Sequence, residues 1–381
     1  MAHGPETTAG ATVSRRKIDI AALMLEGRAL VALVVIIALF AVLSPTYLSA
    51  DNIIVMTRHV AVNAIIALGM LMVILTGGID LSVGSIVGLS GVVAGALLQG
   101  WNLSLWDVVV YPKVWVVIVI AIAIGTLVGL INGVLVTRFK VAPFVATLGM
   151  MYVARGSAML IADGKTFPRL QGELELGNTG FSRVGLGRIA GVPMGVWVMV
   201  VVAFLAFLLL SRTPFGRWVY AVGGNPRAAE LSGVPVRRVQ RWVYVLSGFT
   251  ASIVGLVLAS ELTAATPQTG ESYELNAIAA VVIGGAALSG GRGSVRGTLI
   301  GAFVIGFLSD GLVSVGVSTF WQMVIKGLVI ISAVALDQFQ QGIKRPTPAS
   351  ASTTKPKKQD PGGGGDAVPG ASAPAESRLA G

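Results

Sequence analysis

Polar and ionisable side chains within apolar stretches are the first candidates for chemistry in this sequence. Such groups are costly at membrane depth and usually face a protein interior or a cavity, where they mark the pathways of solutes or ions. The candidate pathway residues are Asn63, Asp80, Asn132, Glu274, Asn276 and Asp310. Lys326 also lies in an apolar stretch, but its long side chain can reach the membrane surface instead. Asp80 and Glu274 also suit a position at an interface, so a structural role stays open for them.

Signatures of catalysis and of metal binding are not met. Gly164-Lys165-Thr166 resembles the end of a phosphate-binding loop, but Met159 stands where that loop requires its earlier glycine. The chain has no cysteine and only two histidines, which are far apart in sequence. It also lacks the H-E-x-x-H motif and the nucleophile elbow. We therefore expect no catalytic residue, no metal, no cofactor and no ATP hydrolysis by this chain.

The composition is that of an integral membrane protein. Hydrophobic residues make up 54% of the chain and charged residues only 12%, against about 25% charged residues in soluble domains. Apolar stretches of helical length recur along the chain, so we expect an all-α, polytopic helix bundle rather than a β-barrel. The net charge of +10 comes from Lys and Arg in loops and tails, where these residues fix orientation in the membrane. We therefore expect contact with membrane lipid and no nucleic-acid partner.

About ten transmembrane or re-entrant helices are expected. They are predicted at residues 29–43, 53–75, 79–98, 114–136, 143–161, 194–210, 242–262, 277–288, 298–317 and 321–336. Residues 18–25 suit the membrane interface. The eighth stretch, 277–288, is introduced by Glu274 and Asn276 and has the length of a broken or re-entrant helix.

The distribution of Lys and Arg predicts a multi-pass protein of the cytoplasmic membrane with both termini in the cytoplasm. An uncleaved tail at 1–28, a transmembrane domain at 29–340 and a disordered tail at 341–381 follow from this topology and from the Pro-, Ala-, Ser- and Gly-rich end. Segment 212–241 would be cytoplasmic. Segment 162–193 would be a small folded excursion on the opposite side, although its charges are mixed.

Glycines recur at spacings that let membrane helices pack backbone to backbone, although such smooth faces also let helices slide. The predicted packing positions are Gly84, Gly88, Gly91, Gly95, Gly125, Gly129, Gly133, Gly293, Gly297 and Gly301. Two glycine-rich breaks also resemble one another, Gly77-Gly-Ile-Asp-Leu-Ser-Val-Gly-Ser85 and Gly284-Gly-Ala-Ala-Leu-Ser-Gly-Gly-Arg-Gly-Ser294. A second internal similarity has a different offset, which argues against a simple repeat.

A polar segment at 223–233 predicts a helix of about seven residues, roughly 10 Å long. Asn225 suits its N-cap, Pro226 its first position and Gly233 a left-handed stop. This helix is too short to be stable alone and too polar to cross a bilayer. Ala228, Ala229 and Leu231 would form a small apolar knob, with Arg227 and Glu230 in water. The local signals fit either an ordinary structured loop or a helix that docks on a partner.

Three motifs resemble those of the permeases of ribose- and xylose-type ABC transporters, in the family of binding-protein-dependent inner-membrane transport components. They are Thr76-Gly-Gly-Ile-Asp-Leu-Ser-Val-Gly-Ser85, Gly224-Asn-Pro-Arg-Ala-Ala-Glu-Leu-Ser-Gly-Val-Pro-Val236, and Tyr273-Glu-Leu-Asn-Ala-Ile-Ala-Ala-Val-Val-Ile-Gly-Gly285 with its continuation Ser289-Gly-Gly-Arg-Gly-Ser294. The similarity covers about residues 25–340. It implies a permease that dimerises with a second copy, binds a cytoplasmic ATPase and receives sugar from an extracytoplasmic binding protein. The ATPase-coupling residues that it implies are Asn225, Arg227, Ala228, Ala229, Leu231 and Gly233.

The resulting hypothesis is a permease subunit that moves a monosaccharide by alternating access, with energy delivered by a separate ATPase. Pentoses are the first choice of substrate, while hexoses, inositols, nucleosides and autoinducer-type furanoses stay open. The alternatives are an ion-gradient-driven transporter of a small polar solute, in which Asp310 would be the buried carboxylate, and a membrane-embedded enzyme, for which no catalytic set is present.

Overall fold

The computed structural model describes residues 27–103 and 108–344. Of the predicted tails at 1–28 and 341–381, residues 1–26 and 345–381 lie outside the described residues, and residues 341–344 belong to a helix instead. The chain divides into two units, Met1–Phe339 and Gln340–Gly381, and the helix bundle belongs to the first.

The described residues form 13 helices and two short hairpins. The helices are α2 (Arg28–Leu43), α3 (Ala50–Leu75), α4 (Val83–Leu98), α5 (Val114–Thr137), α6 (Pro143–Ala162), α7 (Arg183–Leu186), α8 (Met194–Arg212), α9 (Pro214–Gly224), α10 (Pro226–Leu231), α11 (Val236–Glu261), α12 (Tyr273–Ile283), α13 (Val295–Ser314) and α14 (Thr319–Lys344). The hairpins pair β1 (Trp101–Leu103) with β2 (Val108–Val110), and β3 (Arg188–Ile189) with β4 (Val192–Pro193), both antiparallel.

The expected all-α membrane fold is confirmed. Six helices, namely α3, α5, α6, α8, α11 and α13, are long and apolar enough to cross a membrane. Four shorter apolar helices accompany them, which are α2, α4, α12 and α14. Together they correspond to the ten predicted stretches.

Several helix boundaries differ from the sequence prediction. Helix α11 begins at Val236 rather than at 242, because hydropathy marks the apolar part of a helix and not its polar first turns. Helix α4 begins only at Val83, because a glycine-rich break separates it from α3. Helix α9 was not predicted at all, although Thr213 and Pro214 supply an N-cap and a first-turn proline.

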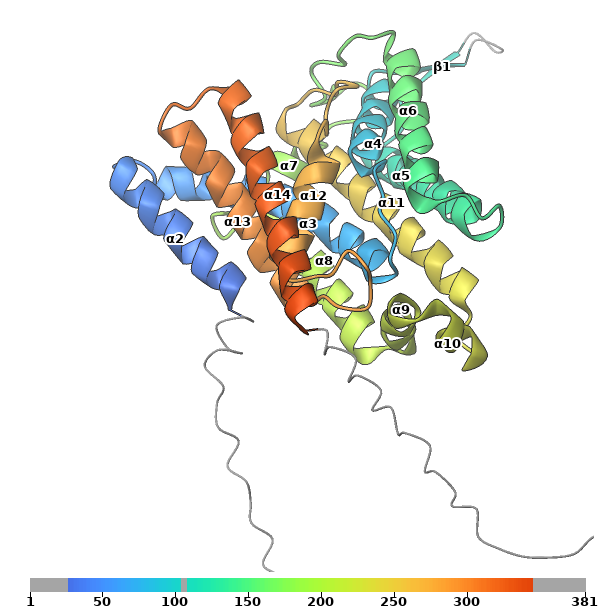
Figure 1. Ribbon diagram of the computed structural model, residues 1–381. Coiled ribbons are helices and arrows are strands. Elements are labelled where there is room, and N and C mark those ends of the chain that lie inside the picture. The colour runs from blue at the N-terminus through green and yellow to red at the C-terminus, as the bar shows by residue number, and fades with distance from the viewer. Residues whose placement is uncertain (1–26, 104–107, 345–381) are drawn as a thin grey trace, which may run out of the picture. The chain divides into compact units, whose positions relative to one another are not determined.

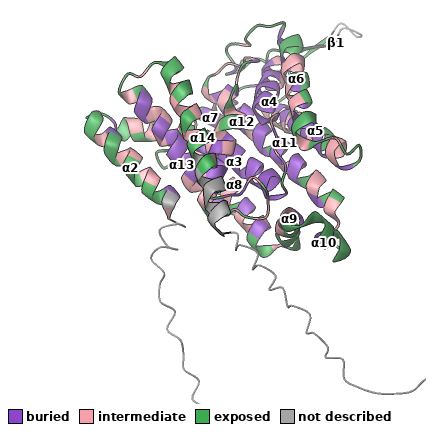
Figure 2. Cartoon of the chain, in the orientation of Figure 1, coloured by how far each residue is buried: buried purple, intermediate pink, exposed green. Residues whose placement is uncertain are grey.

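The helices fall into a central group and a peripheral group. In the most apolar windows, 83% of the residues of α3 and α11 are buried, against 28% for α5, α6 and α8. Figure 2 shows this difference as purple ribbon inside and green and pink ribbon outside. Large apolar side chains cover the outer helices, including Val119 on α5, Leu160 on α6 and Phe204 on α8. Such a surface belongs in lipid, where exposed apolar groups carry no penalty.

Close backbone contacts at glycines join the central helix α11 to α5 and α4. A Cβ atom at Gly129 of α5 would lie 2.3 Å from the Tyr244 carbonyl oxygen of α11, and one at Gly125 would lie 2.6 Å from the Cβ of Ser252. Gly133 faces Arg241 on α11 in the same way, and Gly91 of α4 faces Gly255. There is therefore no room for larger residues along these crossings, as expected for small-residue packing.

The third glycine series is only partly helical. Gly297 and Gly301 lie on α13, where a Cβ would come within 2.1 Å of the Gly284 carbonyl oxygen and 1.9 Å of that of Ala280. Gly293 precedes the helix, with a φ of +155°, and faces Ala286. The spacing of four therefore extends one step beyond the helix that it predicted.

The two ends of the bundle differ in structure. Figure 1 shows α9 and α10 at one end, and the β1–β2 hairpin with the end of α6 at the other. At this second end the segments 162–193 and 262–272 are joined, because Phe167 pairs with Ala265 and the Leu170 amide donates to the Thr263 carbonyl oxygen at 3.0 Å. Gly95 of α4 makes room for the Phe167 side chain at the same place.

Candidate functional site

The short helix α10 is built as its sequence predicts. The Asn225 side-chain oxygen accepts hydrogen bonds from the amides of Arg227, at 3.1 Å, and Ala228, at 3.0 Å. Pro226 occupies the first helical position, and Gly233 has a φ of +83° just beyond the end. The helix has six residues. With α9, it forms a bent arm between α8 and α11.

Five of the six predicted coupling residues face outward, and one does not. Asn225, Arg227, Ala228, Leu231 and Gly233 are exposed, with Leu231 at 76%. Ala229 is only 5% exposed, and its carbonyl oxygen accepts from the Val234 amide at 3.0 Å. Ala229 thus packs against its own chain instead of belonging to the apolar knob, which leaves Ala228 and Leu231 as its apolar members.

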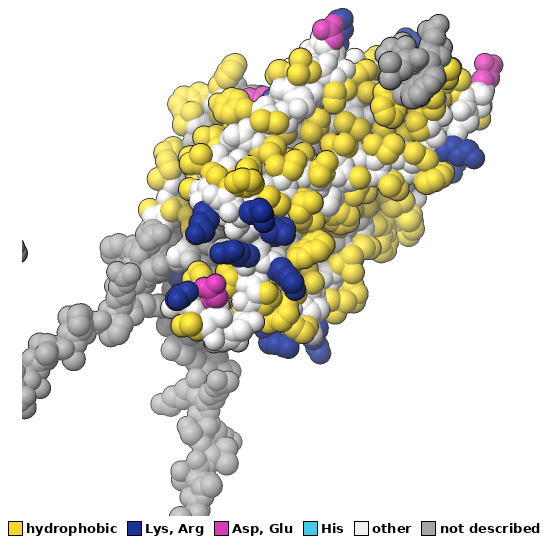
Figure 3. Space-filling model, turned by 90° about the vertical axis from the view of Figure 1, so that its right-hand side faces the viewer, with side chains coloured by type: hydrophobic (Ala, Val, Ile, Leu, Met, Phe, Trp, Pro, Cys, Tyr) yellow, Lys and Arg dark blue, Asp and Glu magenta, His cyan; other side chains and the backbone are white. Residues whose placement is uncertain are grey.

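The surface of the arm is basic. Arg212, Arg217, Arg237 and Arg238 are exposed around it. Arg227 of α10 forms an exposed ion pair with Glu230 at 3.0 Å. Figure 3 shows Lys and Arg side chains gathered toward one end of an otherwise apolar face. Such a patch favours contact with an acidic or polar partner outside the membrane.

Helix α9 ends at a junction of three backbone segments. The Gly291 amide donates to the Leu75 carbonyl oxygen, the last residue of α3, at 2.9 Å. A Cβ at Gly223 would lie 1.7 Å from that oxygen and 2.4 Å from the Gly291 nitrogen. The Tyr220 hydroxyl donates to the Gly293 carbonyl oxygen at 3.0 Å. The arm is therefore attached directly to the two glycine-rich breaks.

A second site is a buried hydrogen-bond network in the break between α3 and α4. Asp80 accepts from the hydroxyl and amide of Ser82, at 2.6 and 3.0 Å, and from the Ser247 hydroxyl at 2.8 Å. The Asn132 amide nitrogen donates to the Ser82 hydroxyl oxygen at 2.8 Å. All four side chains are fully buried. The structure thus unites two predicted pathway residues, Asp80 and Asn132, in one buried network, in which the Asn132 Oδ1 atom has no partner among the described residues.

Tyr244 of α11 lies against the same break. A Cβ at Gly78 would be 2.5 Å from its hydroxyl oxygen. This oxygen is buried and has no hydrogen-bond partner among the described residues. The first break therefore contains both satisfied and unsatisfied polar atoms.

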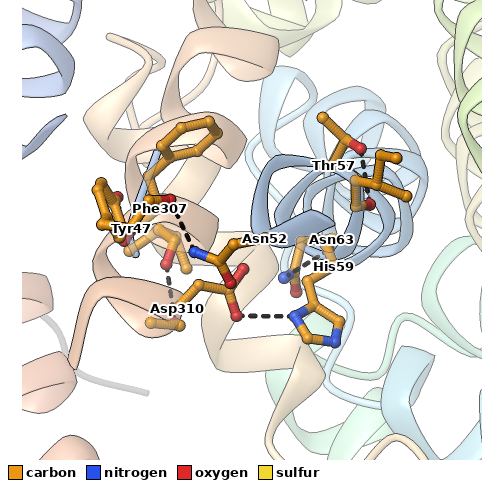
Figure 4. Close-up of polar contacts among 10 residues, drawn as sticks. Tyr47, Asn52, Thr57, His59, Asn63, Phe307 and Asp310 are labelled. Atoms are coloured by element: carbon orange, nitrogen blue, oxygen red, sulfur yellow. Dashed lines mark hydrogen bonds and ion pairs between the residues drawn. The ribbon is translucent and has the colours of Figure 1, made fainter. Parts of the chain in front are cut away.

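The other predicted pathway residues lie elsewhere. Asp310 of α13 bonds His59 of α3, with 2.7 Å between Oδ1 and Nδ1, and the Asn63 amide nitrogen donates to the His59 carbonyl oxygen at 3.0 Å (Figure 4). Arg58, one residue before His59, pairs with Glu261 of α11 at 3.4 Å. This group joins α3 to the later helices.

Glu274 and Asn276 lie in the first turn of α12, apart from these two groups. Both are half-buried. Glu274 packs on α4, because a Cβ at Gly84 would lie 2.3 Å from its Oε2 atom. The six predicted pathway residues are therefore distributed over three places rather than one channel.

Sequence reasoning missed Ser82, Ser247, His59 and Arg155. The two serines carry no signal that separates them from other serines in apolar helices. His59 and Arg155 did carry one, because both are ionisable residues in predicted spans and meet the rule that selected Asp310. Among the described residues, no group of three His, Asp or Glu side chains could hold a metal ion.

Comparison with known proteins places the chain among transport permeases. Residues 52–334 match the family described as branched-chain amino acid transport system / permease component. The ribose import permease protein RbsC of Haemophilus influenzae is 42% identical over 316 residues, which cover 83% of this chain and 94% of that protein. RbsC of Bacillus subtilis is 44% identical over 307 residues, covering 80% and 90% of the two chains.

A hexose relative is also similar. The galactose/methyl galactoside import permease protein MglC of Escherichia coli is 38% identical over 324 residues, which cover 84% of this chain and 96% of that protein. No solved structure matches the chain. The resemblance to permeases of the ribose type is thus confirmed, and these relatives are transport subunits rather than enzymes. The chain belongs to the transport-system permease component family, as a multi-pass membrane protein.

Proposed function

We propose that this protein is the membrane-spanning permease subunit of an ABC-type importer and that it moves a monosaccharide, ribose first among the candidates. The sequence identity of 42% and 44% to two ribose import permeases supports the sugar class. The identity of 38% to a galactose import permease means that a hexose is also a possible substrate. The observation that carries the mechanism is the α9–α10 arm, which is exposed at its tip and attached to two helix breaks at its base.

In this proposal the arm receives force from a separate ATPase. Leu231 and Ala228 supply a small apolar contact, and the surrounding arginines supply charge complementarity. Ala229 holds α10 on its own chain, so a push on α10 moves the whole arm. Because Gly223 lies against Leu75 and Gly291, that movement reaches the end of α3 and the loop before α13 without a flexible connection.

The same proposal assigns sides and partners. The arm and both termini lie in the cytoplasm, because the exposed arginines gather there and Lys and Arg favour the inner side. A soluble binding protein delivers sugar at the opposite end, where segments 162–193 and 262–272 pair. A second copy of the chain completes the pathway, and lipid covers the remaining apolar surface of α5 and α8.

Reconstituted vesicles test this function. Purified permease is inserted together with a candidate ABC-type ATPase and a candidate sugar-binding protein, and uptake of radiolabelled D-ribose is measured with and without ATP inside. We expect uptake that needs ATP and all three components and that persists when an ionophore removes ion gradients. The His59–Asp310 pair is the feature that a gradient-driven carrier would use, so uptake that persists without the ATPase and collapses with the ionophore contradicts the proposal.

The docking role has its own test. Leu231→Glu places a charge on the exposed tip and should lower ATPase binding at least tenfold, since a few central contacts dominate an interface. Leu174→Glu, at a residue 88% exposed near the opposite end, is the matched control and should bind normally. Equal ATPase binding by both variants would contradict the proposal that α10 contacts the ATPase.

A further inference from the structure

A small cavity with a mixed polar and apolar lining lies between α4, α6 and the loop that leads into α12. Its volume is about 290 Å³, close to the lower limit of roughly 300 Å³ for ordinary small-molecule pockets. Its polar lining includes Ser85, Arg155, Gln268, Glu271 and Glu274, and Met151, Tyr152 and Met159 supply the apolar part. These residues come from segments up to about 190 positions apart, and the cavity lies away from the α9–α10 arm.

Arg155 is held in place by backbone groups. Its Nη1 atom donates to the Pro267 carbonyl oxygen and, at 3.0 Å, to that of Thr269. Among the described residues, these are the bonds that the guanidinium makes, and both start from the same nitrogen. Arginine has five N–H donors, so the remaining ones are available at a fixed position.

Ser85 supplies a polar atom without a partner. The residue is 1% exposed, and its hydroxyl oxygen has no hydrogen-bond partner in the described part of the chain. Most buried polar atoms in proteins are hydrogen-bonded, so an unpartnered hydroxyl at a cavity wall indicates a place where a ligand or solvent binds. Ser85 is also the last residue of the first of the three motifs.

Two glycines of α4 make room for the charged groups. A Cβ at Gly84 would lie 2.3 Å from Glu274 Oε2, and one at Gly88 would lie 2.8 Å from Arg155 Nη1. A methyl group at either position would displace a side chain of the cavity. The glycine face of α4, predicted as a packing surface, thus also forms the floor beneath Arg155 and Glu274.

We infer that this cavity is a binding site for a monosaccharide on its way through the protein. This inference rests on the proposed import of sugar. Carboxylates accept hydrogen bonds from hydroxyl groups, the guanidinium donates them, and Gln268 and Ser85 do both. A neutral ligand with several hydroxyls satisfies all of these groups together. Glu271 and Glu274 disfavour an anion, and the Arg155 guanidinium offsets part of their negative charge.

The natural absence of cysteine provides a direct test. Met159→Cys introduces a single thiol at the cavity wall, and Leu174→Cys introduces one in an exposed loop as the control. The rate of modification by a small methanethiosulfonate reagent is measured on purified permease with increasing D-ribose, D-galactose or glycerol. Glycerol is the control for a polyol that lacks a sugar ring.

We expect D-ribose or D-galactose to slow modification at Met159→Cys and to leave Leu174→Cys unchanged, while glycerol has no effect. Adding Glu274→Gln, which keeps the shape and removes the charge, should raise the sugar concentration for half-protection about tenfold or more. Ser85→Ala is the second variant and should raise the sugar concentration for half-protection by a smaller factor.

Two outcomes overturn the site. One is the absence of protection in permease that still imports sugar in vesicles, which leaves the proposed function standing. The other is protection that neither Glu274→Gln nor Ser85→Ala weakens, because the sugar would then act from another place. If the parent permease imports none of the sugars in vesicles, in contrast, the proposed function itself is contradicted.

Discussion

The two glycine-rich breaks begin alike and end differently. In the first, the Gly77 amide donates to the Ile74 carbonyl oxygen at 2.9 Å, and that of Gly78 donates to the Val73 oxygen at 3.1 Å. In the second, Gly285 and Ala286 donate in the same pattern to Val282 and Val281, at 2.9 and 3.1 Å. Gly77 and Gly285 both have positive φ, which completes the same helix-ending motif.

This shared motif shows that the similarity in sequence is out of register by one residue. Alignment by residue identity pairs Gly77 with Gly284, whereas the hydrogen-bond pattern makes Gly77 equivalent to Gly285. Asp80 is then equivalent to Leu288 rather than to Ala287. Matching letters therefore identified two helix ends correctly but paired their residues wrongly.

The breaks differ in the residues that come after the shared motif. The first break reaches α4 at Val83 after a short turn and directs Asp80 into a side-chain network. The second extends to Val295 and makes its contacts through backbone atoms of Gly291 and Gly293. The first break is therefore held by a buried side-chain network, while the second meets the arm through backbone atoms.

Removal of Asp80 should have the largest effect. Asp80→Ala leaves the buried donors of Ser82 and Ser247 without their acceptor, so we expect a loss of about 3 kcal/mol or more in the free energy of unfolding. Asp80→Asn keeps one acceptor oxygen and should lose less. Unfolding in mixed detergent micelles measures both. Ser289→Ala in the second break is the control. If Asp80→Ala loses no more stability than Ser289→Ala, the network does not stabilise the fold.

A side chain at Gly223 should disturb the connection between the breaks. Gly223→Ala forces a methyl group against Leu75 and Gly291, which should destabilise the protein by about 1–3 kcal/mol. ATP-driven uptake should fall as well. Gly224→Ala is a close control, because nothing lies within 4 Å of its Cβ position, and it should stay within about 0.5 kcal/mol of the parent. Similar behaviour of the two variants would contradict the junction.

Loss of the Tyr220 hydroxyl should weaken the second break only slightly. Tyr220→Phe removes the bond to the Gly293 carbonyl oxygen and should cost about 0.5–1.5 kcal/mol in stability. The coupling of ATP hydrolysis to uptake, measured as the ratio of the two rates, should fall more than the stability suggests. An unchanged ratio would mean that this contact does not transmit movement.

The smallest effect is expected at Tyr244 of α11, which lies against the first break. Its buried hydroxyl has no partner in the described residues, so Tyr244→Phe should leave stability unchanged or raise it by up to about 1 kcal/mol. The same unfolding measurement checks this. A clear loss of stability would show instead that the hydroxyl makes a stabilising hydrogen bond.

Local features of the chain could be predicted from sequence, whereas long-range ones could not. Asn225, Pro226 and Gly233 determine the bounds of α10 by interactions within a few residues, so they were identified correctly. The long apolar stretches likewise predicted the spanning helices. The orientation of Ala229 depends on how the arm packs, and no local signal distinguishes it from Ala228.

The candidate sites depend on partners distant in sequence. Asp80 meets Ser247 across 167 positions, and Arg155 meets the Thr269 carbonyl across 114. Hydropathy could identify Asp80 as unusual but could not show which residues form its hydrogen-bond network. Arg155 was overlooked although its charge within a span was visible, and its contacts required the fold.

The central position of α3 has a consequence for biosynthesis. This helix enters the membrane early and carries Arg58, His59 and Asn63 in its first half. The partners of Arg58 and His59 follow 203 and 251 residues later. At a translation rate of roughly 5–20 residues per second, His59 waits about 10–50 s for Asp310 to leave the ribosome. During that time the polar side chains of α3 lack their later partners. The insertion machinery would have to supply polar contacts, which the finished bundle then replaces.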